Sequence, residues 1–114
     1  MRSAIVYVKR IPAAELTEER RPGGGATYVL RYLPEYLERD GAGSVCTGMP
    51  RRKEAYVAEK LFPYFESILP EGDFARRVCR EGRLDPHDRF GMLLVLAHTD
   101  TLGDVTVEER RDER

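Results

Sequence analysis

The alternation of apolar and polar side chains in the first third of the chain predicts β-strands. Ala4–Val8 is rich in β-branched and aromatic residues, and a second extended segment, Ile11–Leu16, follows after two basic residues. Pro12 cannot donate to a strand ladder, so this second strand is expected at a sheet edge. The glycine-rich Pro22–Gly25 predicts a turn, and in Ala26–Leu33 large side chains recur at every second position. The pattern therefore predicts three antiparallel strands.

The spacing of apolar residues changes to three and four from Glu54 onwards, which predicts an amphipathic helix as far as Leu69. Pro63 lies inside this segment and is expected to kink or break the helix near residues 61–62, because proline lacks the backbone donor and crowds the preceding turn. A single helical turn is expected earlier, at residues 34–39, where a proline occupies the first helical position.

Capping residues predict two further helices and a closing strand. Asp73 is expected to cap a helix that ends at Gly82. Asp85 and Pro86 are typical of the N-cap and first position of a last helix. The buried face of that helix is expected to consist of Phe90, Leu93, Leu94 and Ala97. With a strand at residues 103–107, the order of elements predicts an α+β fold, in which helices pack on one side of a small antiparallel sheet.

The length of the chain limits it to one small domain. Its 114 residues can bury a single modest core, whereas a complete protein kinase would need about 200 residues or more. We expect a single domain over residues 1–108 and a charged tail over residues 109–114.

The charge balance argues against nucleic acids as a partner. The chain carries 19 basic and 20 acidic residues, a formal net charge of −1, and lacks the basic excess typical of proteins that bind phosphate backbones. The basic run at residues 51–53 is interpreted as a solvated loop that leads into a helix. The sequence shows neither an apolar segment long enough to span a bilayer nor a signal peptide, so we expect a cytoplasmic protein without membrane contact.

The residue types that carry catalysis are sparse and scattered. Cys46 and Cys79 are 33 positions apart, which fits neither a zinc knuckle nor a redox pair. Neither His87 nor His98 has a nucleophile beside it in the sequence, and His98 is interpreted as a cation at a helix end. The sequence therefore predicts no catalytic residue, no metal site and no cofactor, and we expect a protein that is not an enzyme.

Aromatic residues gather in one part of the chain and allow two interpretations. The five residues concerned are Tyr56, Phe62, Tyr64, Phe65 and Phe74. They either fill the core or include an anchor for a partner protein. Phe74 is the preferred anchor, because the turn before it is expected to direct its side chain away from the preceding helix. The candidate partner-binding residues are Pro70, Glu71, Gly72, Asp73 and Phe74.

The segment Phe62–Gly72 resembles the FF-x-x-LLPEG segment in the N-terminal subdomain of HipA-type serine/threonine kinases. Residues 44–50 resemble the S-x-S-L-P loop of that subdomain. Asp88–Leu93 resembles its D-x-F-x-LL helix, and Asp100–Val105 its D-x-x-G-[AD]-V turn into a strand. The resemblance covers residues 4–108 and implies the fold of this subdomain.

In the family, the ATP-binding loop, catalytic aspartate and metal ligands belong to the kinase core that follows this subdomain, and the chain ends before such a core. A free-standing subdomain is similar to the HipS-like antitoxins of HipBST-type toxin–antitoxin systems. The resemblance implies a non-catalytic antitoxin that binds and inhibits a separately encoded HipT/HipA-like serine/threonine kinase. The alternative is a structural module that assembles with a HipA-like kinase and a HipB-like DNA-binding protein for repression, without inhibiting the kinase.

Overall fold

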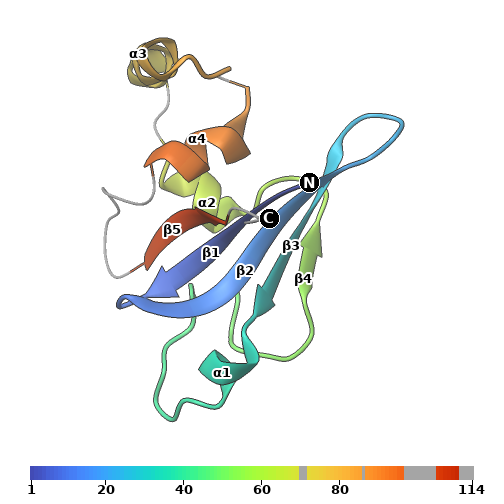
Figure 1. Cartoon of the computed structure of the whole chain (residues 1–114), viewed down its shortest axis with the longest axis vertical. Coiled ribbons are helices and arrows are strands. Elements are labelled where there is room, and N and C mark those ends of the chain that lie inside the picture. Colours follow the sequence, from blue (N-terminus) through green and yellow to red (C-terminus); the bar gives the residue numbers. More distant parts are fainter. Residues whose placement is uncertain (70–71, 86, 97–104, 111–114) are drawn as a thin grey trace.

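A computed structural model of the chain describes residues 1–69, 72–85, 87–96 and 105–110. Within these residues an antiparallel sheet has the strand order β4-β3-β2-β1-β5 (Figure 1). The strands are β1 (Arg2–Val8), β2 (Ile11–Arg20), β3 (Ala26–Tyr32), β4 (Tyr56–Ala58) and β5 (Val105–Arg110). The three strands predicted from the first third of the chain are therefore confirmed, and a short fourth strand lies beside β3.

A two-residue turn joins β1 to β2. Val8 pairs with Ile11, and both residues between them have left-handed backbone angles, with φ 51° at Lys9 and φ 69° at Arg10. Positive φ at both central positions is the requirement of a type I′ turn, whose twist matches that of the flanking strands. The chain makes this turn without the asparagine and glycine that favour it.

The expectation that Pro12 places its strand at an edge is wrong. β2 lies between β1 and β3 and continues to Arg20, four residues beyond its predicted end. Pro12 is accommodated because the part of β2 that pairs with β3 runs from Ala14 to Arg20 and so excludes Pro12. The register between β1 and β2 also shifts near Tyr7, opposite Pro12. The missing backbone donor therefore lies outside the ladder with β3.

The predicted helix from Glu54 to Leu69 is also wrong in its first half. Tyr56–Ala58 forms β4, and the helix α2 spans only Pro63–Ser67. Proline occupies the first position of α2 rather than an interior one, and Phe62 before it is extended, with ψ 140°. A residue before proline disfavours the helical region, so a helix could not continue through Phe62. The expected break near residues 61–62 is confirmed as the start of α2.

The helix α3 spans Gly72–Gly82, so it ends at the expected glycine. The prediction that Asp73 caps it is wrong, because Asp73 lies within the first turn and its side chain accepts a hydrogen bond from Arg76. The end of α3 has the hydrogen bonds of a Schellman motif, from the Leu84 amide to the Cys79 carbonyl and from the Arg83 amide to the Arg80 carbonyl. The left-handed residue in this motif is Arg83, with φ 57°, and not the glycine before it. A non-glycine residue thus takes the position that glycine favours.

The last described helix, α4, spans Arg89–Leu96 and begins later than predicted. Its first turn is capped by Asp88, whose Oδ1 accepts the Gly91 amide at 3.1 Å. Asp85, the predicted cap, instead accepts the backbone amide of His87 at 2.9 Å, while Pro86 and Ala97 lie outside the described residues. The other short helix, α1 (Pro34–Leu37), has proline at its start as predicted.

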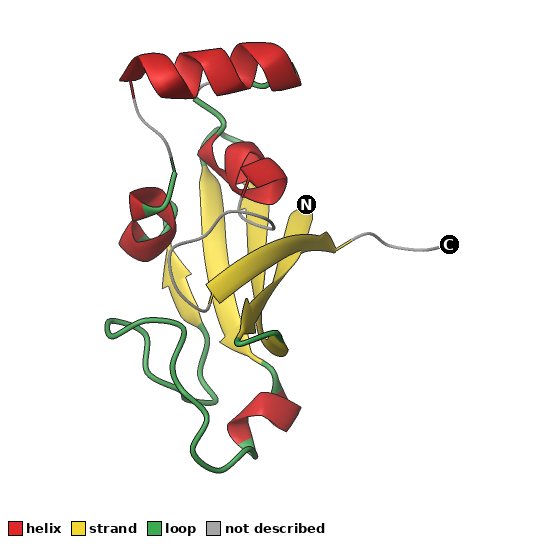
Figure 2. Cartoon of the chain, turned by 90° about the vertical axis from the view of Figure 1, so that its left-hand side faces the viewer, coloured by secondary structure: helices red, strands yellow, loops and turns green. Residues whose placement is uncertain are grey.

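The core lies between one face of the sheet and the helices α2 and α4. It includes Ala4, Val6, Leu16 and Leu30 from the sheet and Phe65, Phe90, Met92 and Leu93 from the helices. The predicted α+β fold, with helices packed on a small antiparallel sheet, is confirmed. Figures 1 and 2 show α3 at the end of the molecule opposite α1. β5 continues to Arg110, which pairs with Ser3, so the last residues of this strand belong to the sheet rather than to a charged tail.

Candidate functional site

The predicted partner-binding residues fall at the start of α3. Pro70 and Glu71 lie outside the described residues. Gly72 begins the helix with φ 63°, a left-handed angle that suits glycine, and Asp73 and Phe74 complete the first turn. Of the five predicted residues, the structure therefore describes three, and they are consecutive on one helical turn.

Phe74 points away from the body of the protein. Its side chain is 61% exposed, whereas Ala75 and Cys79 on the other side of α3 are buried. Asp73 beside it is also exposed and forms an ion pair with Arg76, Oδ1 to Nη1 at 3.3 Å. Phe74 thus lies next to the buried stripe of an amphipathic helix, and its ring is exposed on a helix whose other side packs against the protein through Ala75 and Cys79.

The five clustered aromatic residues divide between the two interpretations given above. Phe62 and Phe65 are buried, and Tyr56 and Tyr64 are half-buried against the core. Only Phe74 among these five is exposed. Four aromatic residues thus follow the core interpretation, and Phe74 does not.

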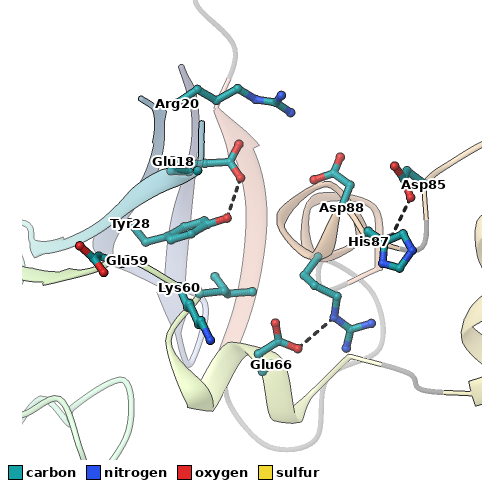
Figure 3. Close-up of a pocket in the computed structure, with 13 residues that line it drawn as sticks. Glu18, Arg20, Tyr28, Glu59, Lys60, Glu66, Asp85, His87 and Asp88 are labelled. Atoms are coloured by element: carbon teal, nitrogen blue, oxygen red, sulfur yellow. Dashed lines mark hydrogen bonds and ion pairs between the residues drawn. The ribbon is translucent and has the colours of Figure 1, made fainter. Parts of the chain in front are cut away.

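A polar cavity of about 480 Å³ lies between the sheet and α4 (Figure 3). It is lined by charged and polar side chains from β2, from β3, from the segment after β4, from α2 and from the approach to α4. Those labelled in Figure 3 are Glu18, Arg20, Tyr28, Glu59, Lys60, Glu66, Asp85, His87 and Asp88. The sequence analysis did not predict this cavity.

A network of charged groups closes one side of the cavity. The Arg2 guanidinium donates to Glu18 Oε1 from Nε and Nη2, at 2.9 and 2.6 Å, and to both carboxylate oxygens of Asp88. Tyr28 Oη donates to the second oxygen of Glu18 at 2.9 Å. Arg2 also lies over the ring of Phe90, with Cζ 5.3 Å from the ring centroid. The network joins three strands to α4.

The environment of this network shifts the acidity of its members. Hydrogen bonding to Arg2 lowers the pKa of Asp88, with the Gly91 amide acting in the same direction and burial opposing both. The hydrogen bond to Asp88 raises the pKa of the Arg2 guanidinium, against the effect of burial. Burial, followed by the hydrogen bond to Glu18, raises the pKa of Tyr28 from 10.0 to about 12. Arg2 and Asp88 are thus held charged, and Tyr28 is held neutral.

One signal in the sequence could have indicated this network. Ala14, Leu16 and Glu18 alternate along β2 and share a face, and the first two are core residues. Glu18 is only 5% exposed, so a carboxylate stands where the period of the strand requires an inward side chain. A buried carboxylate needs a partner, but the sequence alone could not show that Arg2 supplies it.

Further polar side chains of the described residues lie around the cavity. Glu66 accepts a hydrogen bond from Arg89 Nε at 2.9 Å, and His87 is exposed beside Asp85. In the part of the chain that the structure covers, no three histidine, cysteine or acidic side chains gather as metal ligands, and no helix there is long and apolar enough to cross a bilayer. The two cysteines, both within this part, are unpaired thiols. His98 lies outside it.

Comparison with known proteins agrees with this fold. A sequence profile described as HipA N-terminal domain matches residues 4–108. The chain belongs to the HipA N-terminal domain family. Among solved structures it is similar to the "N-terminal domain of HipA toxin", with 25% sequence identity and a TM-score of 0.69. That match covers 99% of this chain and 96% of the solved one. No curated protein matches the sequence significantly.

Membership in the HipA N-terminal domain family confirms the resemblance drawn from the segments around Phe62–Gly72, Asp88–Leu93 and Asp100–Val105. The first of these segments now has a structural meaning. It contains α2 and leads into α3, whose first turn presents Phe74. In the second, Asp88 caps α4 and binds Arg2. The third includes residues 100–104, outside the described part of the chain.

Proposed function

We propose that this HipA N-terminal domain is a non-catalytic antitoxin that binds and inhibits a separately encoded HipT/HipA-like serine/threonine kinase. The family profile covers most of the chain, and the similar solved structure is named as a domain of HipA toxin. The observation that carries the proposal is the exposure of Phe74 on α3, because it gives a domain of this family an aromatic anchor for a second protein.

Inhibition by binding requires an anchor and a rigid support, and it requires no catalytic group. A phenylalanine that moves from water into a pocket contributes roughly 1.5–3 kcal/mol to association. Phe74 has most of its surface still available for such a transfer, and the buried side of α3 fixes its position through Ala75 and Cys79. A kinase cleft that accepts the ring would be closed to substrate for as long as the domain stays bound.

The test is a phosphorylation assay with a purified HipT/HipA-like kinase from the same genome. Addition of the wild-type chain is expected to abolish kinase autophosphorylation at stoichiometric concentration. Phe74→Ala is expected to weaken binding by about 2 kcal/mol, or roughly 30-fold in dissociation constant, because truncation of an aromatic anchor costs this much. Its thermal stability should remain near that of the wild type, because the ring is exposed.

Val57→Ala is the matched control. Val57 is 65% exposed and lies on β4, so the substitution removes exposed apolar surface elsewhere on the molecule. It is expected to leave inhibition intact. If the wild-type chain binds the kinase together with a HipB-like DNA-binding protein and phosphorylation continues unchanged, the structural-module hypothesis replaces the antitoxin proposal.

A further inference from the structure

Arginine is concentrated on α3 and on the turn that follows it. The four residues are Arg76, Arg77, Arg80 and Arg83, and all four are exposed. The same stretch contains two acidic residues, Asp73 and Glu81, in a chain whose formal net charge is −1. The outermost helix of the molecule therefore carries a local excess of positive charge (Figure 2).

Most of this positive charge is not compensated within the described part of the chain. Arg76 forms an ion pair with Asp73, and both side chains are largely exposed. Arg77, Arg80 and Arg83 have no side-chain hydrogen bond or ion pair to another described residue. Their guanidinium groups keep all their donors free for a partner.

Phe74, Arg77 and Arg80 follow one another at intervals of three along α3. Residues three apart are neighbours on a helix surface, so these three residues follow one diagonal row that covers about 9 Å of the helix axis. Arginine and aromatic residues are the side chains most enriched among the energetic centres of protein interfaces. We call this row the α3 arginine face.

We propose that the α3 arginine face binds an acidic segment of the partner protein, whose carboxylates pair with Arg77 and Arg80 beside an apolar notch that accepts Phe74. The guanidinium fork matches a carboxylate at two points, so each pair fixes orientation as well as adding attraction. This inference rests on the proposed function, because it describes the surface of the kinase that the antitoxin would contact.

An acidic protein segment fits this face better than a nucleic acid does. Asp73 and Glu81 lie four residues either side of Arg77 and repel any anion placed opposite them. A nucleic acid carries a phosphate at every nucleotide, whereas a protein segment can place carboxylates opposite Arg77 and Arg80 and donors opposite Asp73 and Glu81. The chain as a whole also lacks the positive charge that drives counterion release from nucleic acids. The exposed Phe74 lies beside Arg77 and Arg80 and favours a partner with an apolar contact surface, which a folded protein provides.

The experiment measures binding of the full chain to the kinase at low and high salt. The double variant Arg77→Glu/Arg80→Glu is expected to raise the dissociation constant about 10-fold or more, because reversed charges repel the acidic segment. The wild-type affinity is expected to fall as salt rises, and that of the variant much less. Arg31→Glu/Lys53→Glu is the matched control, since both side chains are exposed, lie away from α3 and change the net charge equally.

The outcomes separate this inference from the proposed function. If the wild-type chain inhibits the kinase and the α3 double variant inhibits equally well, the inference that the α3 arginine face binds an acidic segment is overturned, while the antitoxin proposal stands. If the wild-type chain does not bind the kinase, the antitoxin proposal fails. A polyglutamate peptide then tests the α3 arginine face alone: binding that the double variant loses supports the inference, and absence of binding overturns it. Binding of duplex DNA through Arg77 and Arg80 would also overturn it.

Discussion

Arg2 and Asp88 are 86 positions apart in the sequence and meet in a two-point ion pair, Nη1 to Oδ2 at 2.9 Å and Nη2 to Oδ1 at 2.8 Å. The same carboxylate caps α4 through the Gly91 amide, and the same guanidinium holds the buried Glu18. One pair of residues thus fixes the first strand, the second strand and the last described helix relative to one another. The first three predictions below concern this network.

Gly91→Ala is expected to destabilise the protein. A β-carbon at this position would lie 2.3 Å from Asp88 Oδ2 and 3.0 Å from Arg2 Nη1, so the pair would have to separate. Alanine favours a helix over glycine by about 1 kcal/mol, and loss of the cap and the pair outweighs this gain by about 1–2 kcal/mol. Urea unfolding measures the difference. Gly23→Ala, with nothing near its β-carbon, is the control, and equal behaviour of the two variants would contradict the prediction.

Acidic pH is expected to lower the stability of the folded protein through protonation of the Asp88 carboxylate. Its pKa in the folded protein lies below the ordinary value of 3.8, so its contribution is complete above about pH 4 and is lost as the pH falls through the folded pKa. Asp88→Asn should be less stable than the wild type at neutral pH and should lose less stability on acidification. Unfolding free energies between about pH 5 and pH 2 test this. Asp73→Asn, at a largely exposed carboxylate, should follow the wild-type curve.

Alkaline pH is expected to lower the stability of the folded protein through ionisation of Tyr28. Its pKa in the folded protein is about 12 against an ordinary 10.0, so the folded state keeps the phenolic proton longer than the unfolded state. The resulting stability is complete below pH 10.0 and is lost as the pH rises towards about 12. Tyr28→Phe should cost about 1–2 kcal/mol at neutral pH, because Glu18 loses a buried donor. The gap between wild type and variant should narrow above pH 10.0; a constant gap would show that Tyr28 does not titrate in this way.

Arg83→Gly is expected to stabilise the protein. Arg83 takes a left-handed angle, φ 57°, at the end of α3, which costs a residue with a β-carbon about 1 kcal/mol relative to glycine. The thermal midpoint should therefore rise. Arg80→Gly makes the same chemical change inside the helix and should lower the midpoint, because glycine weakens a helix interior by about 1 kcal/mol. A fall for both variants would mean that Arg83 makes a stabilising contact in solution.

The sequence indicated the strands well because alternation is a local property. The first three strands follow from neighbouring residues, and the structure changes their limits and moves the second strand from the predicted edge to the interior of the sheet. The prediction of a single helix through Tyr56–Ile68 was wrong, because apolar spacings of three and four also occur when a short strand is followed by a short helix. Pro63 carried the decisive information, since it fixes both the start of α2 and the extended conformation of Phe62.

The candidate site divides in the same way. The exposure of Phe74 could be anticipated because it depends on the position of this residue within one helix period, which is a local property. The charged network beside the polar cavity could not, since Arg2, Glu18, Tyr28 and Asp88 come from four separate segments that only the completed fold brings together. An inward-facing Glu18 shows that a partner is needed, but a single sequence does not identify it.

The position of β1 in the sheet has a consequence for how the protein is made. β1 is synthesised before the other described strands and can pair with β2 as soon as β2 is made, but its other edge is covered only by β5, residues 105–110. While the chain emerges from the ribosome, the backbone edge of β1 that later pairs with β5 therefore stays open to pairing with other chains. This strand also carries the apolar residues Ala4, Val6 and Val8. We therefore expect nascent chains that stall before β5 to aggregate more readily than chains in which β5 has paired with β1.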